Sequence, residues 1–162
     1  KAADGEGVYA RSMYAGAGNA STKLAGEVIG ILAGPNPEEV RSGLDVAVYE
    51  IENGASFYSA NDDDSIPYFA HCISRAGSYL SEGANAEEGT AIAYLIAPPG
   101  EAMVALDAAL KAADVQVGAF YGPPSETNFA GGLLVGSQSA CRAACDAFAN
   151  AVIAVANDPK SY

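Results

Sequence analysis

The sequence predicts an α+β fold with two similar halves, and an internal repeat is the first observation behind that prediction. The tetrapeptide Lys-Ala-Ala-Asp occurs at residues 1–4 and again at 111–114. Each copy leads into a strand-like stretch, a polar loop, a Gly-rich apolar run and a long amphipathic helix. Repetition of such a unit indicates duplicated supersecondary structure. The 162-residue chain is therefore expected to hold two domains.

The second copy is the more complete one. A strand-like run at 91–97 and a helix-like run at 101–110 precede its tetrapeptide. The resulting order of strand, helix, strand, strand, helix predicts a mostly antiparallel sheet with helices packed on one face. The first copy has no such elements before Lys1, so we expect the chain to be the N-terminally truncated part of a longer protein.

The first copy predicts a strand at 8–14, an apolar run at 24–34 and then a helix. Asn36 suits the N-cap, Pro37 the first helical position and Glu39 a capping box. An apolar stripe at helical spacing predicts that one face of this helix lies in the core. Its members are Val40, Leu44, Val48 and Ile51.

The middle of the chain predicts an acidic, solvated loop at 61–65 and then a helix from Pro67 to Leu80. Phe69, Ile73 and Ala76 would face inward from that helix. A strand at 90–97 and a helix carrying Met103, Leu106 and Leu110 follow. The last helix begins near Ser137–Ser139 and ends at Asn157, with a core stripe of Cys141, Cys145, Phe148, Val152 and Val155.

Charge and composition exclude several classes of partner. The net charge is −12 with no long basic run, which disfavours nucleic acid and anionic membrane surfaces. No uninterrupted apolar stretch approaches the roughly 20 residues that cross a bilayer. Three cysteines fit a reducing cytosol better than a disulfide framework.

No catalytic constellation is recognisable, so the sequence predicts a protein that is not an enzyme. The single histidine, His71, falls inside the predicted 67–80 helix, and no Gly-x-Ser-x-Gly elbow is present. Cys141 and Cys145 fit a packed core stripe, and Cys72 is left open as a disulfide partner for one of them. The Asp62–Asp64 run lacks the pattern of a calcium loop. No metal site and no cofactor are expected.

Two polar loops remain as candidates for a binding site. One runs from Gly122 to Phe129; its counterpart in the first copy runs from Gly16 to Leu24 and is followed by Glu27. Their density of donors and acceptors suits a small polar ligand. A purely structural turn explains them as well, and the residues alone leave both interpretations open.

Six short strings resemble the L-type shell proteins of the ethanolamine-utilisation bacterial microcompartment. They are Gly34–Glu39, Ile51–Ala55, Ser74–Leu80, Ala97–Pro99, Ala108–Gln116 and Pro123–Asn128. The resemblance implies two tandem, circularly permuted, ferredoxin-like shell domains. Residues 1–58 would be the remainder of the first domain and 59–162 the second.

The resemblance also implies function. It implies a homotrimer that mimics a hexamer, tiles with other shell proteins in the bacterial cytoplasm, and has gated pores for small molecules such as ethanolamine. The residues matching the ethanolamine and pore site are Glu27, Phe57, Thr127, Asn128 and Phe129. A further acidic ligand in the family would belong to the missing N-terminal part. The alternative is a regulatory α+β module that binds small molecules without tiling.

Overall fold

The structure, a computed structural model, describes residues 9–15, 28–54, 57–123 and 128–159. A first lobe holds the antiparallel pair β1 (Tyr9–Ala15) and β2 (Val28–Ala33), followed by α1 (Pro37–Asn53). A second lobe holds a five-stranded antiparallel sheet in the order β3-β4-β5-β7-β6. Its strands are β3 (Tyr58–Ser59), β4 (Pro67–Ile73), β5 (Ala91–Ala97), β6 (Val115–Tyr121) and β7 (Ala130–Gly136).

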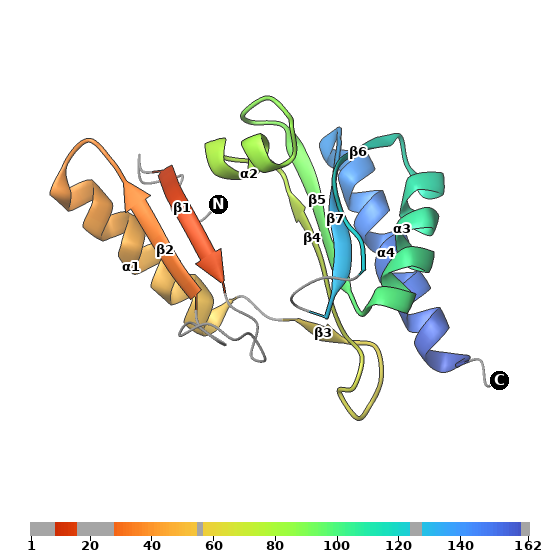
Figure 1. Ribbon diagram of the computed structural model, residues 1–162. Coiled ribbons are helices and arrows are strands. Elements are labelled where there is room, and N and C mark those ends of the chain that lie inside the picture. The colour runs from red at the N-terminus through yellow and green to blue at the C-terminus, as the bar shows by residue number, and fades with distance from the viewer. Residues whose placement is uncertain (1–8, 16–27, 55–56, 124–127, 160–162) are drawn as a thin grey trace.

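Two long helices cover one face of the larger sheet. Figure 1 shows α3 (Pro99–Ala112) and α4 (Gln138–Asn157) side by side on that face, with the first lobe on the other side of the sheet. The core between helices and sheet includes Leu95, Leu134 and Phe148, which are at most 1% exposed. The predicted α+β sandwich is confirmed.

A short helix, α2 (Ser78–Gly83), lies against the opposite face of the same sheet. Beneath it, a smaller cluster of buried residues gathers Ile73, Ile92 and Leu133 from three neighbouring strands. Because strand side chains alternate between faces, these residues point away from α3 and α4. The sheet therefore presents a second, partly apolar face to the space where the first lobe lies.

The repeat predicted from sequence is visible as repeated geometry. Antiparallel pairing shifts register between Ala10 and Ser12 in β1, and between Val117 and Ala119 in β6. Each shift falls in the middle of the strand that opens its unit. A β-bulge bends and twists a strand locally. The two hairpins therefore share such an irregularity at an equivalent position of their first strand.

Helices α1 and α4 begin at the predicted N-caps. The Asn36 side chain accepts a hydrogen bond from the Glu39 amide at 2.9 Å and donates one to the Glu39 carboxylate at 2.8 Å. Ser137 caps α4 by accepting from the Ala140 amide at 3.2 Å. Both satisfy amide groups that would otherwise lack partners at a helix start.

The prediction of a helix at 67–80 is wrong. Residues 67–73 form strand β4, and a helix begins only at Ser78. Tyr68 and Cys72 face the main core while Ile73 faces the opposite cluster, so both faces of β4 carry apolar side chains. Apolar residues on both faces hide the alternation that would have identified a strand.

The core stripe predicted for α1 is largely exposed. Leu44 is 50%, Val48 44% and Ile51 70% exposed, whereas Gly43 on the same helix is buried. On α4 the stripe contacts β4, β5 and α3; within the described residues, α1 contacts β2. The pattern was correct about which residues share a face, but that face is not covered in the structure.

The last helix is long and apolar enough to cross a membrane by length and composition, although Arg142 and Asp146 interrupt its apolar sequence. Helix α4 has 20 residues and a mean hydropathy of 1.3 in its most apolar window. Core helices of soluble proteins pass the same test. Cys141, Phe148 and Val152 on α4 are fully buried against the sheet and α3, while 28% of its apolar window as a whole is buried.

Candidate functional site

An aromatic cluster lies where the chain enters β3 and β7. Phe57 directly precedes β3, and Phe129 directly precedes β7. Their ring centroids are 5.9 Å apart, and the Phe57 ring is also 5.6 Å from that of Phe69 on β4. These separations are within the range of favourable ring pairs. Residues distant in sequence thus meet at this end of the sheet.

The cluster continues across the sheet through Phe69. Its ring meets Tyr94 on β5 edge to face, with centroids 5.8 Å apart and an interplanar angle of 88°. The ring of His71, two residues along β4, also contacts that of Phe69, with centroids 5.7 Å apart and an interplanar angle of 30°. In the antiparallel register His71 lies opposite Tyr94, so all three side chains share one face. The aromatic residues line the face opposite α3 and α4.

The structure describes three of the five residues predicted for the ethanolamine site. It brings Phe57 and Phe129 together and leaves Phe57 50% exposed. Asn128 is exposed and has a φ of 60°, a left-handed conformation that Asn tolerates better than most residues. Glu27 and Thr127 lie outside the described residues.

The sequence interpretation missed Phe69 and Tyr94 as neighbours of that site. Assigning 67–73 to a helix placed Phe69 on a stripe with Ile73, away from any strand. One signal favoured a strand instead, the aromatic residues Tyr68 and Phe69 together with the β-branched Ile73. A β4–β5 pairing would have placed Phe69 and Tyr94 diagonally across from each other.

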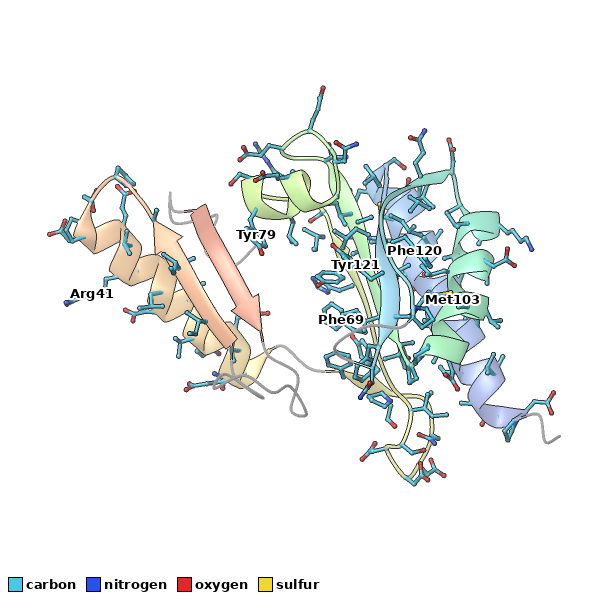
Figure 2. The ribbon with its side chains drawn as sticks, viewed as in Figure 1. Arg41, Phe69, Tyr79, Met103, Phe120 and Tyr121 are labelled. Atoms are coloured by element: carbon cyan, nitrogen blue, oxygen red, sulfur yellow. The ribbon has the colours of Figure 1, made fainter. Side chains whose placement is uncertain are left out.

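Beside this cluster, a cleft of about 400 Å³ opens between α2 and the sheet. Tyr79, Leu80 and Glu82 line it from α2, and Tyr94, Leu133 and Tyr121 line it from the strands. In Figure 2, Tyr79 and Tyr121 extend from their separate elements toward the same space, and Phe69 lies farther along the sheet. Burial, and then the nearby phenol groups of Tyr121 and Tyr79, raise the pKa of Tyr94. Tyr94 is therefore neutral at physiological pH.

The cysteines have the properties of packing residues. Burial raises the pKa of the Cys145 thiol to about 12, and Cys72 and Cys141 add to that shift. Burial also raises the pKa of Cys141. Both thiols stay protonated at neutral pH, and the thiolate is the nucleophilic form. Cys72 lies on β4, not on a helix, with its sulfur 3.7 Å from the carbonyl oxygen of Gln138. The structure has all three as free thiols.

The acidic loop is exposed, as predicted. Asp62, Asp63 and Asp64 all face solvent. Asp63 accepts a hydrogen bond from the Ser65 amide at 3.1 Å, and hydrogen bonding with Ser65 lowers the pKa of its carboxyl group. Among the residues that the structure describes, no group of three or more His, Cys, Asp and Glu side chains is arranged to hold a metal ion.

Comparisons with known proteins identify the chain's relatives. No family model matches the sequence. The shell protein EutL of Clostridium perfringens is 68% identical over 162 residues, covering 100% of this chain and 75% of the relative. EutL of Escherichia coli is 53% identical over 154 residues, covering 95% of this chain and 70% of the relative. A crystal structure of the ethanolamine utilisation protein EutL from Leptotrichia buccalis is 65% identical and superposes with a TM-score of 0.88, covering 99% of this chain and 77% of that one.

These matches confirm the resemblance drawn from six short strings, and with it the shell-domain fold. They also confirm a structural role in the microcompartment shell, within the bacterial cytoplasm, in place of catalysis. Shell proteins of this family assemble with other shell proteins. The alternative, a regulatory module that does not tile, lacks such assembly. The chain belongs to the EutL family of bacterial microcompartment shell proteins.

Proposed function

We propose that this shell protein assembles as a homotrimer whose subunits each contribute two similar domains to a pseudo-hexameric tile. Residues 1–58 belong to the first domain and 59–162 to the second. The observation that carries the proposal is the structural repeat: β1-β2-α1 and β6-β7-α4 share strand order, the position of a β-bulge and a capped helix. Three copies of a two-domain chain give six similar edges around a ring.

Sedimentation velocity on the purified protein tests this assembly. A species with three times the mass of the 16.4 kDa chain is expected, and its share should rise with protein concentration. A strict monomer across the accessible concentration range would contradict the trimer.

We further propose that the tile has gated pores for small molecules, and that ethanolamine binds in small pores at Glu27, Phe57, Thr127, Asn128 and Phe129. The contact that supports the site is the Phe57–Phe129 ring pair, which joins two of these positions across the sheet end. A carboxylate and carbonyl oxygens suit a primary ammonium group, and a hydroxyl or amide suits the alcohol. The net charge of −12 favours a cationic ligand.

Calorimetric titration with ethanolamine tests the site. Glu27→Ala and Thr127→Ala should each weaken binding about tenfold or more, since a charge-assisted hydrogen bond contributes about 1.5–3 kcal/mol. Glu38→Ala, at an exposed carboxylate on α1, is the matched control and should leave affinity unchanged. Unchanged binding in both site variants would show that ethanolamine binds elsewhere or not at all.

A further inference from the structure

The cleft between α2 and the sheet has no role in the function proposed above. Its lining comes from four elements: α2 gives Tyr79, Leu80 and Glu82, β5 gives Tyr94, β7 gives Leu133, and β6 gives Tyr121. The volume of about 400 Å³ falls in the range of small-molecule sites. Three phenols, two leucines and one carboxylate thus converge on one recess.

We propose that this cleft binds a free quaternary ammonium ion, with the tyrosine rings as an aromatic cage and Glu82 as the counter-charge. Aromatic rings attract cations through their electron-rich faces, and cages of this kind recognise ammonium groups carrying methyl substituents. The site uses none of the five residues assigned to ethanolamine, so it stands or falls separately from the ethanolamine proposal.

Packing holds the cage in shape. Tyr94 is partly buried, and its ring is fixed edge to face against Phe69 at 5.8 Å. Tyr79 is 37% and Tyr121 51% exposed, so both remain accessible to a ligand entering from solvent. A ring that is ordered before binding loses little conformational freedom when the ligand arrives. One anchored and two accessible rings suit a cage that is open on one side.

The charge of the lining selects a cation. Tyr94 is neutral at physiological pH, because burial raises its pKa above the ordinary range. Among the described residues that line the cleft, Glu82 is the one that carries a charge at that pH. That carboxylate would repel an anion entering the cleft.

The apolar part of the lining favours methylated over primary ammonium. A primary ammonium needs several hydrogen-bond acceptors to replace its hydration. Leu80 and Leu133 offer none from their side chains but can contact methyl groups. A quaternary ammonium ion has no N–H groups to satisfy, so it loses least on entering a recess of rings and leucines.

Calorimetric titration of the full protein with choline tests the inference, with 3,3-dimethylbutan-1-ol as the uncharged ligand of the same shape. We expect saturable choline binding and at least fivefold weaker binding of the alcohol. Tyr121→Leu and Glu82→Gln should each weaken choline about fivefold, whereas Tyr121→Phe keeps the ring and most of the affinity. Tyr49→Leu and Glu88→Gln, at exposed positions outside the cleft, are matched controls with unchanged affinity.

Several outcomes would overturn the inference: no saturable choline binding, equal binding of choline and the alcohol, or full affinity in both Tyr121→Leu and Glu82→Gln. Far-UV circular dichroism confirms that each variant is folded before titration. Thr127→Ala must leave choline binding intact; its loss there would place the cation at the ethanolamine site. Co-sedimentation with phosphatidylcholine vesicles separates a free ion from a lipid headgroup, and pelleting of the protein would contradict the free ion.

Discussion

Val152 on α4 and Ile51 on α1 occupy equivalent positions in the two repeats, and truncating them should have unequal effects on stability. Val152 on α4 is 0% exposed, whereas Ile51 on α1 is 70% exposed. Val152→Ala removes two methyl groups, a loss of about 1.6 kcal/mol at about 0.8 kcal/mol each. The remaining cavity of roughly 50 Å³ adds about 1 kcal/mol. We therefore expect Val152→Ala to lower the free energy of unfolding by about 2–3 kcal/mol, and Ile51→Ala to lower it by less than about 0.5 kcal/mol.

Urea unfolding followed by far-UV circular dichroism measures both changes. The chain has no tryptophan, so the helical signal is the practical probe. We expect the urea midpoint to shift for Val152→Ala, while the slope of the free energy of unfolding against urea concentration does not change. Equal losses in the two variants would show that the α1 stripe is packed as tightly as that of α4, and the account of the first lobe would be refuted.

Three further predictions concern the backbone, a cap and a thiol. Gly131→Ala should lower the melting temperature because the added carbon would collide with a carbonyl oxygen of β5, whereas Gly100→Ala, with nothing within 4 Å, should raise it slightly. Asn36→Ala should cost about 1 kcal/mol in urea unfolding through loss of the α1 cap, and Asn36→Ser should restore most of it. Burial raises the pKa of Cys145 from 9.0 to about 12, so the stability that this thiol contributes is present below about pH 9 and is lost toward pH 12. Between about pH 8 and 10.5, Cys145→Ala should therefore lose less stability than the parent protein. An equal loss of stability in both proteins would contradict the pKa shift.

The helix boundaries were predictable because their signals are local. Asn36 and Ser137 each bond to an amide three residues ahead, and both helices begin where the cap pattern places them. The strand at 91–97 was equally readable, since its run of buried apolar residues is too short for a helix and lies between turn signals. In each case the information sits within a few residues of the feature it determines.

Local signals predicted a helix for 67–73, where the structure has a strand, and the reason is physical. Strand β4 is covered by α4 on one face and carries the aromatic cluster on the other, so Tyr68 and Phe69 are both apolar although they point in opposite directions. A helical period then fits as well as an alternating one. The contact that decides between them is pairing with β5, which lies about two dozen residues later in the chain.

The candidate sites depend even more on distant contacts. Val40 and Leu44 on α1 have the same spacing as Cys141 and Cys145 on α4, yet Leu44 is 50% exposed and Cys145 only 7%. Periodicity thus determines which residues share a face, and the elements packed nearby determine whether that face is core or surface. The same holds for the cleft, whose tyrosines lie on α2, β5 and β6, with helix α3 between the last two in the chain. No window of sequence contains the cage, so a ligand for it had to be inferred from the assembled sheet and α2.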